Sequence, residues 1–213
     1  MVLSFIIKKY YRKRRSFSTG FSLPEILVVI AISVVIGISV WTLFIDIFSS
    51  SRTAQGRLQI QQELQVILRR VSAELRSASA SSVGSYVLAT TTDSTLSFYV
   101  DRDNDGLKEQ IRYFLQGTDL KKGILKPSGT PLGYTGSETV RTMVKNVRAT
   151  STPIFSYYDT NYAGTTTPLT QPVSASSIRL VKITVVVDDD INDALPPLVG
   201  TTQVSVRTIK DNL

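Results

Sequence analysis

The sequence predicts an α+β protein in which a long N-terminal α-helix packs on an antiparallel β-sheet. Three observations support this prediction: a charge-free stretch at Ile26–Ile45, apolar residues at helical spacing as far as Ala78, and short alternating segments after Ser82. We divide the 213 residues into a basic N-terminal segment at 1–20, an apolar helix at 21–48, an amphipathic helix at 49–82 and a β-rich domain at 83–213.

The apolar helix is long enough to cross a bilayer. The run extends to Phe48, and about 20 apolar residues span a hydrocarbon core of ~30 Å. A secretory signal peptide has a shorter apolar core of about 7–15 residues and a small-residue cleavage site, which residues 41–43 do not provide. Pro24 falls in the first helical turn, where its missing N–H costs nothing. We therefore expect a membrane-inserted helix.

The net charge of +7 comes almost entirely from the N-terminal segment. Six of the 24 basic residues lie in the first 20 positions, which contain no acid, and the remaining 18 nearly balance 17 acidic residues. A basic cluster directly before a membrane helix holds that end in the cytoplasm. We therefore expect the domain to be extracytoplasmic and expect no direct binding of nucleic acid.

The segment at 49–82 carries one apolar stripe. Its members recur at steps of three and four residues: Ile60, Leu64, Leu68, Val71, Leu75 and Ala78. Glutamine and arginine residues occupy the other faces, which is the pattern of an amphipathic helix packed on a domain. No proline separates this segment from the apolar helix, so the two are expected to form one long helix.

The domain at 83–213 is expected to be built from short strands. The expected strands are Thr95–Val100, Gln110–Leu115, Asp119–Leu125, Thr139–Val147, Ile154–Tyr158, Ile178–Val187 and Gln203–Ile209. Asn161–Ser177 and Asp188–Gly200 are rich in turn-forming residues and are expected to be loops.

The turn after the first expected strand has the beginning of a calcium-binding loop. Asp101, Asp103, Asp105 and Glu109 occupy loop positions 1, 3, 5 and 9, and Gly106 occupies position 6. Position 12, where a bidentate glutamate is required, is Arg112. The loop also joins two strands rather than two helices. A polar hairpin turn without metal is the favoured prediction, and a calcium site at the four acids is the alternative.

The residue inventory argues against an enzyme. The chain has no cysteine and no histidine, and it lacks a Gly-x-Ser-x-Gly motif and a glycine-rich phosphate loop. We therefore expect no catalytic residue and no cofactor other than the calcium alternative. Without disulfides, the domain must be stabilised by its apolar core.

The segment Gly20-Phe21-Ser22-Leu23-Pro24-Glu25-Ile26-Leu27-Val28-Val29-Ile30-Ala31-Ile32 resembles the leader junction of type IV pilins and type II secretion pseudopilins. The resemblance implies that a prepilin peptidase cleaves after Gly20 and methylates the amine of Phe21. Glu25 then becomes the fifth residue of the mature chain, and it is expected to neutralise the Phe21 amine of a neighbouring subunit. The alternative role for Glu25 is to cap its own helix.

The rest of the chain resembles minor subunits of this family, namely J-type pseudopilins and W-type pilins. The resemblance lies in Leu64–Ala78, in Leu96–Asp101 followed by Ile111–Leu115, and in Val144–Val147, Phe155–Tyr158 and Ile178–Ile183. Major pilins typically have a helix-breaking proline at the position of Thr42, so its absence favours a minor subunit.

The resemblance implies a structural subunit that helps to initiate or cap a filament of a type II secretion, type IV pilus or DNA-uptake system. Its expected partners are the prepilin peptidase, other pilin or pseudopilin subunits and, before assembly, the inner membrane, with the N-terminus in the cytoplasm. The filament then lies in the periplasm or at the cell surface. The alternative is a signal-anchored extracytoplasmic binding or adhesion domain that never assembles and keeps residues 1–20.

Overall fold

The structure is a computed structural model that describes residues 20–148, 150–188 and 196–206, with side chains except at 46 and 49–54. The helix α1 spans Leu23–Arg76. It is followed by β1 (Leu88–Thr91), β2 (Thr95–Val100), β3 (Glu109–Gln116), β4 (Asp119–Leu125), β5 (Thr139–Val144), β6 (Phe155–Tyr158), the 3-10 turn η1 (Ala175–Ser177), β7 (Leu180–Val187) and β8 (Leu198–Ser205). The α+β class is therefore confirmed.

The chain forms two compact units that meet within α1. The first is Met1–Thr53 and the second is Ala54–Leu213. In the first unit, every described residue from Gly20 to Ile45 is exposed. The second unit contains the strands and the core.

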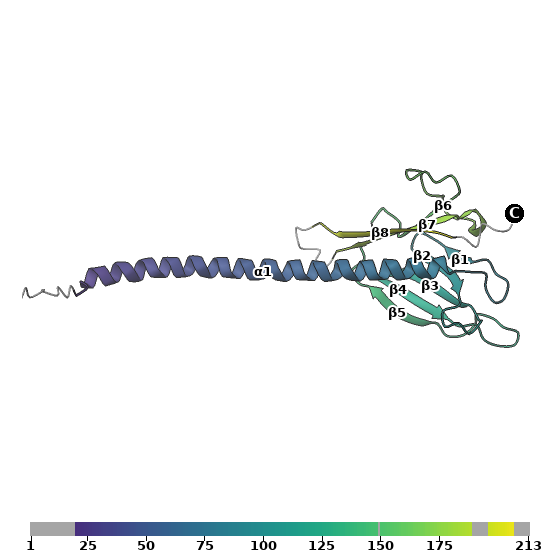
Figure 1. The fold of residues 1–213 in the computed structure, drawn as a ribbon, viewed down its shortest axis with the longest axis horizontal. Helices are drawn as coiled ribbons and strands as arrows, with labels where there is room; N and C mark the ends of the chain where they lie inside the picture. The colour runs from purple at the N-terminus through teal and green to yellow at the C-terminus, as the bar shows by residue number, and fades with distance from the viewer. Residues whose placement is uncertain (1–19, 149, 189–195, 207–213) are drawn as a thin grey trace, which may run out of the picture. The chain divides into compact units, whose positions relative to one another are not determined.

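The strands of the second unit form two antiparallel sheets rather than the one sheet expected. The larger has the order β1-β2-β3-β4-β5, and the smaller has the order β6-β7-β8. An isolated bridge joins Val147, which follows the end of β5, to Val187 of β7. Figure 1 shows the C-terminal part of α1 between the two sheets. The sequence pattern identified the strands but did not indicate that Phe155 begins a separate group of pairings.

The predicted apolar stripe of α1 packs into the core. Leu64, Leu68, Val71, Leu75 and Ala78 are all buried, and Ile60 is partly buried against them. The core joins these residues to apolar side chains from both sheets, so the helix provides one wall for each sheet.

The smaller sheet approaches α1 closely through β8. A Cβ atom on Gly200 would lie 2.8 Å from Leu68 Cδ1. Ser72 Oγ and Thr202 Oγ1 are also 3.0 Å apart and share a hydrogen bond. A small residue at position 200 is therefore part of the contact between helix and sheet.

Several element boundaries differ from the sequence prediction. β3 extends one residue further at each end, β5 already ends at Val144, β6 begins at Phe155 and β7 begins at Leu180. The helix ends at Arg76, and β1 was missed because only one of its four residues is buried. β8 begins at Leu198, inside a segment expected to be a loop, because it pairs with β7 along its whole length. Of the predicted strand Gln203–Ile209, residues 207–209 lie outside the described residues.

Candidate functional site

The predicted processing junction lies directly before α1. Gly20 and Phe21 precede the helix and are exposed, with Phe21 at 74%. The first turn is closed by hydrogen bonds from the backbone N–H groups of Glu25 and Ile26 to the carbonyl of Ser22, at 3.0 and 3.2 Å. The peptide bond between Gly20 and Phe21 therefore lies in exposed chain outside the helix.

Glu25 caps the helix on which it lies. The backbone N–H of Ser22 donates to Glu25 Oε2 at 3.4 Å, which is long for an N–H···O bond. Ser22-Leu23-Pro24-Glu25 has the spacing of a capping box, in which a glutamate at the third helical position reaches back to the N-cap N–H. The side chain of Glu25 remains exposed. The structure thus shows the capping role in the single chain, and that role leaves the carboxylate accessible to another partner.

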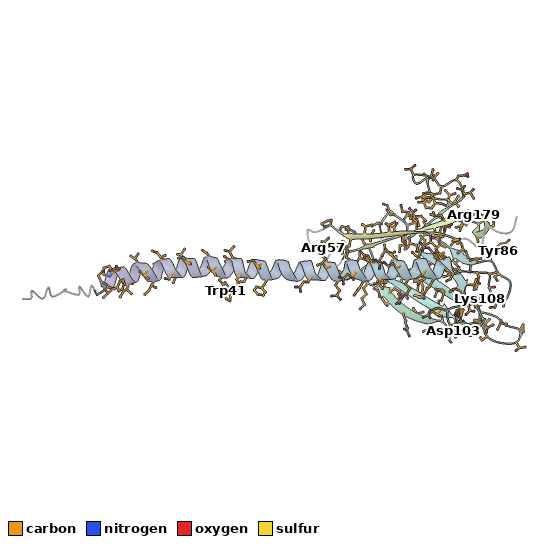
Figure 2. The ribbon with its side chains drawn as sticks, in the orientation of Figure 1. Trp41, Arg57, Tyr86, Asp103, Lys108 and Arg179 are labelled. Carbon is orange, nitrogen blue, oxygen red and sulfur yellow. The ribbon has the colours of Figure 1, made fainter. Side chains whose placement is uncertain are left out.

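Apart from Glu25 and the hydroxyls of Ser33, Ser39 and Thr42, the helix after the junction presents apolar surface to its surroundings. Leu23–Ile45 is long and apolar enough to span a membrane, and none of it is buried within the chain. At 1.5 Å per residue its 23 residues extend about 35 Å, which exceeds the ~30 Å of a hydrocarbon core. Trp41 is one of these exposed side chains (Figure 2). An apolar surface of this size needs lipid or other helices to cover it.

The predicted calcium loop forms a tight turn between β2 and β3, which we call the acidic hairpin (Asp101–Glu109). Three of its carboxylates accept backbone N–H groups of the same loop: Asp101 from Gly106 (3.1 Å), Asp105 from Leu107 (2.8 Å) and Glu109 from Arg102 (2.9 Å). These are ordinary turn interactions of Asp and Glu side chains. Figure 2 marks the hairpin by Asp103 and Lys108.

Lys126, just beyond the end of β4, supplies a cation to the acidic hairpin. Its Nζ is bonded to Asp103 and lies 3.9 Å from Asp105 Oδ2 and 3.5 Å from Glu109 Oε1. The hydrogen bond lowers the pKa of the Asp103 carboxyl below its usual range and raises the pKa of Lys126. The side chain of Glu109 is only 3% exposed, so Lys126 neutralises a largely buried carboxylate.

The structure brings together three of the four predicted calcium ligands. Carboxylate oxygens of Asp101, Asp103 and Glu109 lie within 4.8 Å of one another. Asp101 Oδ1 is buried and has no hydrogen-bond partner within the described residues. Calcium, however, needs six to eight oxygens, and Arg112 at the twelfth loop position is bonded to Glu138 instead. A calcium ion and the Lys126 ammonium would compete for the same carboxylates, so the metal-free turn remains the favoured prediction.

A buried polar network between α1 and the larger sheet was not predicted from the sequence. Glu74 Oε2 accepts the hydroxyl of Tyr113 at 2.7 Å, and Glu74 Oε1 accepts Lys122 Nζ. Arg102 Nε lies 4.0 Å from the same Glu74 Oε1 atom. Burial lowers the pKa of Lys122 and raises that of Tyr113. The one available signal was an acid directly before Leu75 of the apolar stripe.

This network fixes how α1 lies on the sheet. The side chain of Lys122 is 7% exposed and that of Glu74 is 14% exposed, so each charge depends on the other for compensation. A shift of the helix by one turn would separate them and leave both charges largely desolvated. The network is therefore a positioning device rather than a reactive site.

No protein-family model matches this sequence, and no curated protein matches it either. The assignment of a function to the chain accordingly depends on its own residues and geometry.

Proposed function

We propose that this chain is a structural subunit of a type IV filament system, namely a minor pilin or pseudopilin that helps to initiate or cap the filament. One observation carries the proposal: the junction from Gly20 to Glu25 leads into α1, whose segment Leu23–Ile45 is predominantly apolar and exposed. In this function a prepilin peptidase cleaves after Gly20 and methylates the amine of Phe21. The filament serves type II secretion, a type IV pilus or DNA uptake.

The exposed apolar surface supports two successive environments for α1. Before assembly, lipid covers Leu23–Ile45, and afterwards the same helices of neighbouring subunits cover it in the filament core. The stripe from Leu64 to Leu75 is buried within the second unit, so its residues are already covered in the single chain. The helix therefore has one stretch for assembly and another for its own domain.

Glu25 would have one hydrogen-bond partner in the single chain and another in the filament. In the single chain its carboxylate bonds the N–H of Ser22 at 3.4 Å, and this long bond costs little to exchange. Among packed apolar helices, the charged amine of Phe21 must be paired with an opposite charge. We propose that Glu25 moves from its cap to the Phe21 amine of a neighbouring subunit on assembly.

Mass analysis of the mature N-terminus tests the processing step. Cells with an active prepilin peptidase should yield a chain that begins with N-methyl-Phe21, and peptidase-deficient cells should retain residues 1–20. A Gly20→Leu variant should remain uncleaved because a bulky side chain blocks the scissile bond. An intact N-terminus in peptidase-positive cells would instead favour the signal-anchored binding or adhesion domain, which the membrane-spanning length of Leu23–Ile45 equally supports.

Two substitutions at Glu25 separate pairing from capping. Glutamine keeps the capping hydrogen bond but has no charge, whereas alanine has neither. If charge pairing is required, Glu25→Gln and Glu25→Ala are both cleaved normally and both fail to enter filaments. If capping is the requirement, Glu25→Gln assembles and only Glu25→Ala fails. Assembly is measured as the sheared-filament fraction of each variant relative to its membrane pool.

The orientation in the membrane is tested by cysteine labelling. The chain has no cysteine, so a single introduced thiol gives an unambiguous signal. Tyr86 is 71% exposed (Figure 2), and Tyr86→Cys should react with a membrane-impermeant maleimide from the extracytoplasmic side. In peptidase-deficient cells, which retain residues 1–20, Ser16→Cys in the basic segment should react only after the membrane is opened, because the basic residues keep it in the cytoplasm. The reverse pattern would contradict the proposed topology.

A further inference from the structure

A hollow of about 570 Å³ lies between α1 and the outer strands of the larger sheet, β4 and β5. All five charged residues that line it, within the described chain, are cations: Arg70, Arg102, Lys122, Lys126 and Arg141. We call this hollow the basic cleft. Its remaining lining is a mixture of small polar and apolar residues from the β4–β5 region.

The positive charge of the basic cleft is only partly compensated. Lys122 and Arg102 share Glu74, and Lys126 pairs with the acidic hairpin. Arg70 and Arg141 form no ion pair and donate no side-chain hydrogen bond within the described residues. Both are exposed. Two cations of the cleft are therefore available to an external anion.

The placement of these cations opposes folding rather than supporting it. Arg141 lies directly opposite Lys122 in the β4–β5 register, and like charges at such positions are destabilising. The pKa of Lys122 is lowered first by burial and further by the charges of Arg102 and Arg70. Because this arrangement of cations lowers the stability of the fold, it indicates that the cations interact with another molecule.

The basic cleft lies beside the edge of the larger sheet at β5, which no further strand in the described residues covers. β5 is the last strand in the order β1-β2-β3-β4-β5, and Thr139–Thr142 are exposed. Figure 1 shows β5 at the outer edge of the larger sheet. Such an edge offers backbone N–H and C=O groups to an added strand. A small anion could use the cations but not this edge, whereas a peptide could use both.

We propose that the basic cleft binds an extended acidic segment of another protein, which pairs with the free edge of β5. Thr139, Arg141 and Met143 are alternate residues of β5, and all three line the cleft. An added strand would also present every second side chain to that face. The segment should therefore carry Glu or Asp at alternate positions, facing Arg141 and Arg70. This inference goes beyond the proposed function and does not depend on processing or assembly.

The test measures binding of a fluorescent hexapeptide of alternating Glu and Thr to the full chain in detergent micelles, by anisotropy at low salt. Arg70→Gln combined with Arg141→Gln should weaken binding roughly two- to thirtyfold, as expected for the loss of two partly exposed ion pairs. Lys121→Gln is the matched control, because Lys121 is adjacent to Lys122 on β4 and so faces the other side of the sheet. Its affinity should be unchanged.

The single variant Arg141→Lys keeps both positive charges and should retain most of the affinity for the peptide. That result would show that the assay responds to the charge at position 141 and not to a change in folding. Thermal unfolding of each variant accompanies the binding assay. Equal affinity of the double variant and the Lys121→Gln control would overturn the proposal, and so would equal binding of a hexapeptide of alternating Gln and Thr.

Three further probes decide the class of ligand. Inorganic phosphate should displace the peptide only at far higher concentration, and a short DNA duplex should bind no more tightly than the peptide does. Hexapeptides N-methylated on alternate residues test strand addition, since only one of the two sets of N–H groups faces β5. The hexapeptide methylated on the N–H groups that face β5 should not bind, and the hexapeptide methylated on the other N–H groups should still bind. Equal potency of phosphate, tighter binding of DNA, or indifference to both methylation patterns would each overturn the proposal.

Discussion

Replacement of Glu74 by glutamine tests whether the buried network holds α1 on the sheet. Glutamine keeps an acceptor for the Tyr113 hydroxyl but removes the charge that compensates Lys122. Breaking a buried ion pair costs about 3–5 kcal/mol because the remaining charge is left desolvated. Glu74 keeps 14% of its side-chain surface exposed, so we expect the lower end, about 3 kcal/mol.

A second substitution shows whether the cost comes from the uncompensated cation. Lys122→Met removes the charge and keeps an unbranched side chain of similar length, and glutamine at 74 still accepts the Tyr113 hydroxyl. The double variant should therefore recover to within about 1 kcal/mol of the wild type, because apolar replacement of a buried pair is often nearly neutral. Lys122→Met alone should be unstable, since it leaves the Glu74 carboxylate without its closest cation.

The assay is denaturant unfolding of the full chain in detergent, followed by near-ultraviolet circular dichroism of the tyrosines. Trp41, the one tryptophan of the sequence, lies in the apolar segment, whereas Tyr113 and Tyr157 are core residues of the second unit. A cost below about 1 kcal/mol for Glu74→Gln, or a double variant as unstable as the single one, would refute the reasoning.

Three further predictions follow from the second unit. Burial raises the pKa of Tyr113 and of Tyr157 above the ordinary value of about 10, so stability present below that pH should fall by roughly 1.4 kcal/mol per unit for each tyrosine as the pH rises above about 10.5. Tyr113→Phe should lessen that slope by about 1.4 kcal/mol per pH unit in alkaline denaturation, and an unchanged slope would contradict the assignment. Lys126→Ala frees the acidic hairpin, so millimolar calcium should raise the melting temperature of this variant more than that of the wild type; if neither responds, the calcium alternative fails. Gly200→Val should cost about 1–3 kcal/mol by overpacking against Leu68, and Gly200→Ala should cost less because the end of that leucine can turn aside; equal unfolding midpoints for both variants and the wild type would refute this contact.

The sequence predicted those features that depend on local periodicity. The apolar stripe from Leu64 to Leu75 was confirmed residue by residue, because burial of one helix face imposes a 3.6-residue pattern, and Ala78 is buried just beyond the end of α1. The strands β2 and β4 have their predicted bounds, since turn residues delimit both. In β8, by contrast, Gly200 and the preceding Pro196 and Pro197 weaken the strand signal, and only pairing with β7 makes the segment a strand.

The sequence did not predict the pairings that join distant charges. Lys122 meets Glu74 across 48 residues, and Lys126 meets Asp103 across 23. Neither lysine differs in local pattern from Lys121, which bonds only Gln116 within the described residues. Which lysine of β4 is buried depends on which face of the strand the helix covers. The candidate calcium loop was therefore visible in the sequence, but the cation that competes for it was not.

Some charged side chains of the chain are paired with an opposite charge of the same domain and others are not. This difference is informative about function. Glu74 and Glu109 are nearly buried and are paired with cations of the same domain, so each is explained by stability. Glu25 is exposed and is bonded to Ser22 only at 3.4 Å, while Arg70 and Arg141 have no acid partner in the described chain. Selection for stability alone would replace a like-charge neighbour of Lys122 and would not need an acid within an apolar helix. We therefore expect substitutions at Glu25, Arg70 and Arg141 to leave the unfolding free energy within about 0.5 kcal/mol of wild type or to raise it, and yet to impair contacts with other proteins. If they destabilise the isolated subunit as strongly as Glu74→Gln does, these charges belong to the fold and the interaction surfaces proposed for them are wrong.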